Sequence, residues 1–207
     1  VYLNGSVQIG NSNTPTVTVS TTGTTSLYVY GTAGIGNLTV KAGSTLDLST
    51  KIFNKSTSAP SVAGGTLTLE AGAILRLAAT SGGQTGSNFP LNFTTASPVL
   101  NATSTVEYYG ASDQTIYDVA APGYGNLTLT NNSIKTATAG LDVQAALTIN
   151  STSTFAAGTS LTHNVGGTWT NNGTFSYTTG NTIVLNGSSN QSIAGSSTTS
   201  FNNLTNS

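Results

Sequence analysis

The sequence contains no cysteine and no methionine, and only five basic and six acidic side chains occur among its 207 residues. Without cysteine, disulfides, thiol catalysis and thiolate metal sites are excluded. No run of about 18 apolar residues exists, so no membrane-spanning helix is predicted. The lack of an initiating methionine predicts a fragment or a processed chain, and no signal peptide is visible.

Charge is scarce at 5% of residues, against about 25% in ordinary soluble domains. The net charge is −1 and no basic patch exists, so the sequence predicts no nucleic-acid partner. Hydrophobic residues still make up 36% of the chain and recur at regular positions, unlike a disordered polar tract. We therefore expect a folded, secreted protein stabilised by hydrogen bonding and repetition, with no cofactor.

A short repeat is visible in "GNLTVKAGSTLDL" (residues 36–48) and "GTLTLEAGAILRL" (residues 65–77), 29 positions further on. Apolar and polar residues alternate within each copy, which is typical of strands three to five residues long. Weaker relatives occur along the rest of the chain. Ser, Thr, Asn, Gly and β-branched residues also disfavour helix interiors. The sequence thus predicts an all-β protein with no significant helix.

Two architectures fit such short strands, an antiparallel sandwich and a β-solenoid. The charges favour the solenoid, because the 29-residue repeat aligns Lys41 with Glu70 and Asp47 with Arg76, all at outward positions. Coils stacked in register would place each opposite pair about 4.8 Å apart, whereas a hairpin would reverse the strand order. We expect a parallel β-helix of about nine coils, a rod near 45 Å long.

A longer repeat relates residues 105–130 to residues 182–207 at an offset of 77, which we interpret as a super-unit of about three coils. The first residues, "VYLNG", also match "IVLNG" at residues 183–187. We expect one elongated solenoid over residues 1–207, with sub-regions 1–100 and 101–207. Its expected partners are copies of itself or flanking repeats, end to end. The matched positions are Gly110 with Gly187, Gln114 with Gln191, Ile116 with Ile193 and residues 126–128 with residues 203–205.

The ionisable residues predict no catalytic or metal site. The six acids are spread along the chain, whereas glycoside hydrolysis needs a pair or cluster. Asp113 and Asp118 flank "QTI" and favour turn formation; calcium binding stays an alternative, although no Asp-rich loop occurs. His163 is the single histidine, which we expect at the surface or in a turn. Trp169 takes an inward position of the alternation, so we expect it in the core.

Three tyrosines are candidates for carbohydrate contact: Tyr109, Tyr117 and Tyr124, which we expect to be partly exposed. Aromatic faces on a surface of low charge can stack on sugars. Ordinary aromatic packing at coil corners is the alternative interpretation of the same residues.

The segments "GTWTNNGTFSY", "TIVLNGSSNQSI" and "FNNLT" resemble repeats of very large secreted surface proteins and adhesins of Bacteroidota and related bacteria. Those repeats read G-x-W-T-N-N-G-T-F, then T-V-x-F-N-G-x-x-x-Q-x-I, then F-x-N-L-T. The resemblance is clear over residues 105–207 and looser over residues 1–100, and Leu185 stands where Phe is usual. It implies export to the cell surface and a passive stalk or adhesive role.

The sequence therefore favours a non-enzymatic extracellular rod, part of an adhesin, a stalk or a self-assembling surface filament. A carbohydrate-binding module on a β-helix is the alternative, with surface glycans as partners. Ice binding is less favoured, because the threonine rows that begin at Thr16 and Thr18 do not recur at a constant coil length. A polysaccharide-degrading enzyme is also less favoured, because it would need the missing acid cluster.

Overall fold

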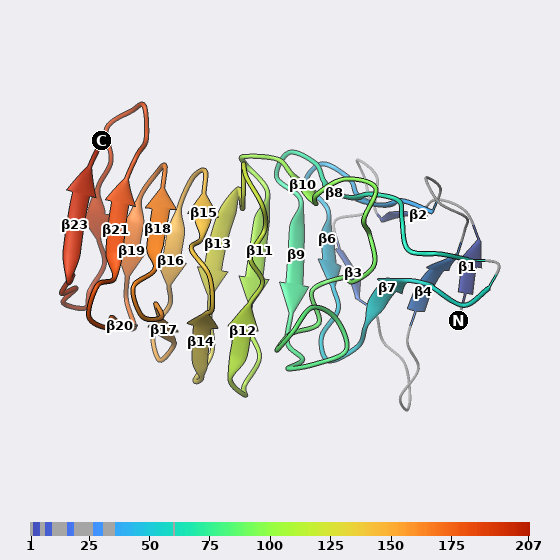
Figure 1. The fold of residues 1–207 in the computed structure, drawn as a ribbon, viewed down its shortest axis with the longest axis horizontal. Coiled ribbons are helices and arrows are strands. Elements are labelled where there is room, and N and C mark those ends of the chain that lie inside the picture. Colours follow the sequence, from blue (N-terminus) through green and yellow to red (C-terminus); the bar gives the residue numbers. More distant parts are fainter. Residues whose placement is uncertain (1, 5–6, 10–15, 19–26, 31–35, 60) are drawn as a thin grey trace.

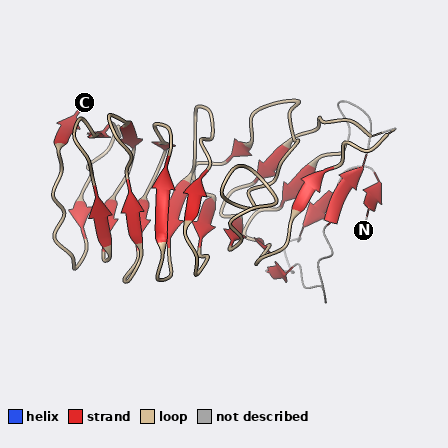
Figure 2. Ribbon diagram, turned by 60° about the horizontal axis from the view of Figure 1, so that its bottom comes forward, coloured by secondary structure: helices blue, strands red, loops and turns tan. Residues whose placement is uncertain are grey.

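The computed structural model describes residues 2–4, 7–9, 16–18, 27–30, 36–59 and 61–207. All regular structure in these ranges is β-strand, and every strand pairing is parallel (Figure 2). The strands stack along one long axis, with the two ends of the chain at opposite ends of the stack (Figure 1). No element in the described ranges is a helix able to cross a membrane. The predicted parallel β-solenoid is confirmed.

One sheet, the long sheet, runs the whole length of the stack. Each coil contributes one strand to it, and among the described residues this sheet has eight strands, one fewer than the expected nine or so coils. At a spacing of about 4.8 Å, its first and last strands lie about 34 Å apart. In chain order the strands are β3 (Thr16–Thr18), β6 (Thr45–Asp47), β9 (Ile74–Leu77), β11 (Thr105–Tyr108), β13 (Asn126–Leu129), β16 (Leu147–Ile149), β19 (Trp169–Asn171) and β22 (Ile193–Ala194).

Two smaller sheets complete the coils of the N-terminal half. The first contains β1 (Tyr2–Asn4), β4 (Leu27–Tyr30) and β7 (Phe53–Lys55). The second contains β2 (Val7–Ile9), β5 (Leu38–Val40), β8 (Leu67–Leu69) and β10 (Val99–Leu100).

Two others complete the C-terminal half. The first C-terminal sheet contains β12 (Gln114–Ile116), β14 (Ile134–Ala137), β17 (Thr154–Ala156) and β20 (Thr174–Ser176). The second C-terminal sheet contains β15 (Asp142–Val143), β18 (Thr162–Val165), β21 (Thr182–Leu185) and β23 (Asn203–Asn206).

The coils are wide at the N-terminal end and narrow at the C-terminal end. Thr45 pairs with Ile74, 29 positions on, and Ile74 with Thr105, 31 positions on. After β11 the spacing falls to between 20 and 24, as in the pairs Leu127–Leu147 and Trp169–Ile193. The 29-residue repeat is therefore one wide coil, and each of its copies places its strands in the same two sheets.

The 77-residue repeat behaves differently from the expected stack of three coils. It relates β11 in the long sheet to β21 in the second C-terminal sheet, and β13 to β23 in the same way. The motif thus returns after three and two-thirds coils, on another side of the solenoid. The reason is arithmetic, since 77 residues are not a whole number of coils that are 20 to 24 residues long.

The core consists of side chains stacked in columns along the axis. On the long sheet Leu75 lies in register with Val106, Val106 with Leu127, and Leu147 with Trp169. All five side chains are completely buried, which confirms the predicted core position of Trp169. In most strands alternation leaves the intervening residues facing outward, and many of these residues are threonine.

Candidate functional site

The glycine and glutamine of the 77-residue repeat form a corner between coils. The buried side chain of Gln114 accepts the Gly110 N–H through Oε1 at 2.8 Å. Its Nε2 donates to two carbonyls of the preceding coil, Leu77 O at 3.3 Å and Ala79 O at 3.0 Å. Gln114 therefore ties its own turn to the coil beneath it.

Gln191 makes the same contacts in the second copy. Its Oε1 accepts the Gly187 N–H at 2.8 Å, and its Nε2 donates to Val165 O at 2.7 Å and Gly167 O at 3.0 Å. A Cβ on Gly187 would lie 2.0 Å from the Gly166 carbonyl oxygen, so only glycine fits there. The G-x-x-x-Q motif is thus a structural corner, and sequence reasoning found its residues without its geometry.

The charged residues aligned by the 29-residue repeat are in contact. Lys41 pairs with Glu70, and Arg76 Nη1 lies 2.9 Å from Asp47 Oδ2. Arg76 also binds Glu107 through Nε at 2.6 Å, so three coils are joined by one guanidinium. Glu107 was missed because its coil is 31 residues long, which breaks the 29-residue alignment.

The three candidate tyrosines do not form one exposed platform. Tyr109 is half-buried, donates its hydroxyl to Asp47 Oδ1 at 2.6 Å, and has the Arg76 guanidinium 4.3 Å from its ring centre. Tyr117 is half-buried against Phe89, with ring centres 4.8 Å apart. Tyr124 is completely buried, so the expectation that it is partly exposed is wrong.

Tyr124 belongs to an internal network at the first narrow coil. Its hydroxyl lies 3.1 Å from the hydroxyl of Tyr108 and donates to the carbonyl of Tyr117. The Tyr117 N–H donates to the Tyr108 hydroxyl at 3.0 Å. Burial raises the pKa of Tyr108 to about 12, and it also raises the pKa of Tyr124. These hydroxyls fasten the connection between β12 and β13 to the core.

Two lysines are buried, which the sequence did not indicate. Lys135 points inward from β14, where its Nζ donates to Gly110 O at 2.8 Å and to the Ser133 hydroxyl. Burial lowers the pKa of Lys135 to about 8. Lys55 donates from Nζ to the Val62 carbonyl at 2.7 Å, and burial lowers its pKa as well. The alternation of β14 is inverted, because Ile134 is exposed and Lys135 faces inward.

His163 is completely buried, so its expected surface or turn position is wrong. Its Nδ1 accepts the Leu141 N–H at 3.2 Å, and its Nε2 lies 2.8 Å from the Ala157 carbonyl. An acceptor role at Nδ1 requires a neutral ring with its proton on Nε2. Burial lowers the pKa of His163, in keeping with this neutral form. The backbone partners come from adjacent turns, which sequence reasoning could not bring together.

The acids that flank "QTI" have separate surroundings. Asp113 accepts the Ile134 N–H at 2.9 Å through Oδ1, which links a turn to the next coil. Asp118 is exposed. No group of three or more His, Asp or Glu side chains suited to a metal ion occurs in the part of the chain that the structure describes.

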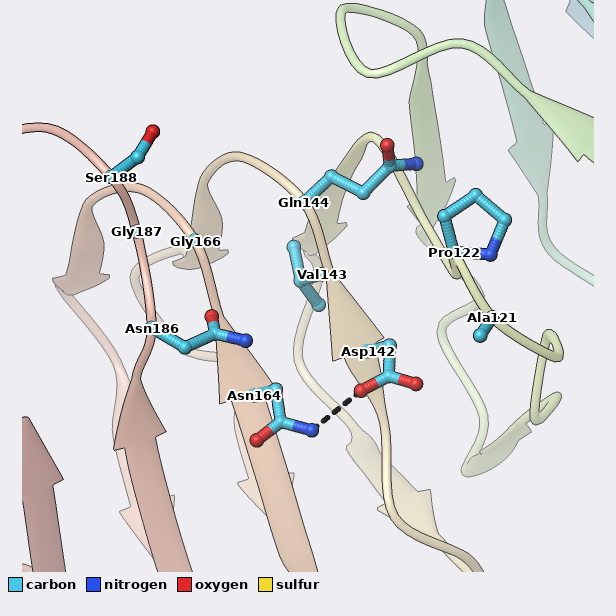
Figure 3. Close-up of a pocket in the computed structure, with 10 residues that line it drawn as sticks. All are labelled: Ala121, Pro122, Asp142, Val143, Gln144, Asn164, Gly166, Asn186, Gly187 and Ser188. Carbon is cyan, nitrogen blue, oxygen red and sulfur yellow. Dashed lines mark hydrogen bonds between the residues drawn. The ribbon is translucent and has the colours of Figure 1, made fainter. Parts of the chain in front are cut away.

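A polar hollow of about 490 Å³ lies over the second C-terminal sheet (Figure 3). Asp142, Asn164 and Asn186 follow one another across neighbouring coils, and Asn164 Nδ2 donates to Asp142 Oδ1 at 2.6 Å. The hollow contains amides and one carboxylate, which can hydrogen-bond a hydroxyl-rich ligand. Its lining residues are Ala121, Pro122, Asp142, Val143, Gln144, Asn164, Gly166, Asn186, Gly187 and Ser188.

Comparison with family models, with curated proteins and with solved structures found no match for this chain. What the molecule does is therefore inferred from its own contacts, of which the corner glutamines, the Arg76 ion pairs and the hollow are the most distinctive.

Proposed function

We propose that this chain is a non-catalytic segment of an extracellular rod, in a cell-surface adhesin, a stalk or a surface filament. The observation that carries the proposal is the direction of its polar contacts. Gln114, Gln191 and Arg76 bind groups of neighbouring coils, not one another around a common cleft. Side chains that bind neighbouring coils stiffen the solenoid along its axis.

Asparagines at strand starts add further links between coils. Asn126 donates from Nδ2 to Ser104 O at 3.0 Å in one adjacent coil and accepts the Ala146 N–H at 3.1 Å from the other. Asn37 accepts the Thr66 N–H of the next coil at 2.8 Å. Because each coil of a solenoid contacts only its neighbours, such links set the rigidity of the rod.

The extracellular location is supported by composition and by the resemblance to secreted surface repeats. A chain without cysteine and with few charges relies on main-chain ladders and buried amides, which do not depend on redox conditions. A stiff spacer of this kind would hold a binding element away from the cell surface.

The proposal is tested on cells that produce the protein. Gold-labelled antibody against the purified chain should decorate intact, unpermeabilised cells, at a distance from the outer surface. Labelling that requires permeabilisation would contradict the extracellular assignment. Electron microscopy of the purified chain then separates the two forms of the proposal. Filaments indicate a self-assembling subunit, and single short rods indicate a spacer segment.

Carbohydrate binding is a second candidate function, favoured by the polar hollow. Asn164 and Asn186 present amides beside the Asp142 carboxylate, the groups that hydrogen-bond sugar hydroxyls. A glycan array should then identify ligands that bind the chain and are lost by Asn186→Ala. Ser151→Ala, at an exposed position that does not line the hollow, is the matched control. Equal binding by both variants would place the sugar elsewhere.

A further inference from the structure

The polar hollow over the second C-terminal sheet owes its shape to a glycine. The strands β15, β18 and β21 pair in register, so the residues that follow their buried ends, Gln144, Gly166 and Asn186, form one row across three coils. A Cβ on Gly166 would lie 2.3 Å from the Gln144 carbonyl oxygen, so no side chain can fill the middle of this row. The hollow of about 490 Å³ is therefore built into the corner, and its volume is usual for a ligand site, about 300–1,000 Å³.

Hydrogen bonds inside the hollow use its donors and leave its acceptors. Asn164 Nδ2 donates to Asp142 Oδ1 at 2.6 Å. Gln144 Nε2 donates to Leu100 O at 3.3 Å and to Gly123 O at 3.4 Å. Among the described residues, Asp142 Oδ2, Gln144 Oε1 and Asn164 Oδ1 have no further partner. Three acceptor oxygens, one of them on a carboxylate, thus remain for a ligand.

The negative charge of the hollow has no cation beside it. Figure 3 shows the second oxygen of Asp142 pointing away from Asn164. Every ion pair found in the described ranges contains Lys41 or Arg76, and none contains Asp142. No Lys or Arg follows Lys135 in the sequence, and Lys135 itself is buried with its Nζ bound to a carbonyl and a hydroxyl. A ligand that brings a positive charge would complement this carboxylate.

We propose that the hollow binds the protonated amine of an amino sugar, within a glycan whose hydroxyls contact the Asn186 amide. An ammonium group has three donors and no acceptor, which matches the acceptor oxygens left at Asp142, Gln144 and Asn164. Its hydrogen bond to a carboxylate is charge-assisted and stronger than one between neutral groups. The proposal rests on carbohydrate binding at this hollow, the second candidate function above, and specifies the class of sugar.

The surroundings of the carboxylate favour a sugar over a lysine side chain. Asn186 is exposed, and its amide has no partner among the described residues, so it can both donate to and accept from hydroxyls. Ala121 and Pro122 add a short apolar wall against which ring carbons can pack (Figure 3). A lysine carries one polar group on an apolar stem and would leave the Asn186 amide unused.

The test compares two glycans that differ only at nitrogen. A chitosan oligosaccharide carries a free amine on each sugar, and a chitin oligosaccharide of the same length carries an acetamide there. We expect the chain to bind the chitosan oligosaccharide about fivefold more tightly in calorimetric titrations, in a buffer of low salt that keeps the amine protonated. Added salt should reduce this preference. Equal affinities would overturn the proposal and leave carbohydrate binding at the hollow in place.

Two variants locate the preference. Asp142→Asn removes the charge and keeps an oxygen for Asn164 Nδ2, so it should abolish the preference and leave the affinity for the chitin oligosaccharide unchanged. Asp118→Asn removes the same charge from an exposed acid that does not line the hollow, and this matched control should keep the preference. If both variants lose it equally, the preference comes from the overall charge of the chain and the proposal is wrong.

A lysine oligopeptide separates the amine from the sugar. We expect it to bind more weakly than the chitosan oligosaccharide, because it has no ring hydroxyls for Asn186. Equal binding would overturn the assignment to an amino sugar. If neither oligosaccharide binds, the proposal also fails, and the glycan array with Asn186→Ala still decides whether another sugar occupies the hollow. Cell labelling tests the rod proposal independently of all these titrations.

Discussion

Gln114 and Gln191 make the same three hydrogen bonds at two different sides of the solenoid. Gln114 begins a strand of the first C-terminal sheet, whereas Gln191 precedes the long-sheet strand β22. The G-x-x-x-Q motif therefore specifies a corner, and the strand that follows it can belong to different sheets.

Replacing the buried corner glutamine should destabilise the fold. Gln114→Leu removes the partners of the Gly110 N–H and the Ala79 carbonyl, and we expect a loss of about 2–3 kcal/mol in the free energy of unfolding. Urea denaturation followed by circular dichroism measures it. Gln84→Leu, at a half-buried glutamine outside the corners, should change little. Equal effects of the two variants would mean that the corner contacts are not the cause.

The Arg76 side chain should matter more than Lys41. Arg76→Met leaves the carboxylates of Asp47 and Glu107 without their shared cation. We expect a loss of about 1 kcal/mol, because a third of the side chain is exposed and its ion pairs are screened. Lys41→Met breaks one ion pair, in which both partners are partly exposed, and should lower the denaturation midpoint less than Arg76→Met does. Added salt should reduce the Arg76→Met effect, and an effect independent of salt would contradict its ionic origin.

Burial of Lys135 predicts a stability that rises in mild alkali. Its pKa is lowered to about 8 in the folded protein, against about 10.4 when unfolded, so the unfolded chain binds more protons between those values. The free energy of unfolding should increase by on the order of 2 kcal/mol from pH 8 to pH 10. Above pH 10 the trend reverses, because the raised pKa values of Tyr108 and Tyr124 favour ionisation in the unfolded chain.

The control for this pH effect is a comparison of two lysine variants. Lys135→Met should abolish most of the rise between pH 8 and pH 10, whereas Lys41→Met should keep it. Denaturant titrations at half-unit intervals resolve the slope. A rise that persists in Lys135→Met would assign the effect to Lys55, whose pKa burial also lowers.

His163 predicts a loss of stability in mild acid. Its folded pKa lies below its unfolded value of about 6.5, so unfolding takes up a proton as the pH falls through this range. Stability should be fully present above pH 6.5 and fall below it, by at most about 1.4 kcal/mol per pH unit. His163→Leu should flatten the profile between pH 6.5 and pH 5, since this is the single histidine of the chain. If the pH dependence of stability is the same in His163→Leu, the loss of stability in acid comes from the carboxylates and not from His163.

The fold was predictable where neighbouring coils carry a local sequence signal. Lys41 with Glu70 and Asp47 with Arg76 align without gaps because the first coils have one length, and their opposite signs indicate parallel stacking. Glu107 escaped notice because its coil gains two residues. His163 and Lys135 were misplaced or overlooked because they bind main-chain groups that lie far from them in the sequence or in other turns. The partners of a polar residue at an inward position can be identified only when the path of the chain through each coil is known.

The length of the 77-residue repeat relates its two copies by a screw operation along the solenoid axis. Each repetition advances the corner of Gly187 and Gln191 by three and two-thirds coils, so three repetitions restore the starting side after about eleven coils. A longer array of such repeats would show a threefold screw with a rise of about 18 Å per repeat. Equivalent turns, such as residues 111–113 and 188–190, would then follow a spiral around the rod. They would face a partner on each of three sides of the rod.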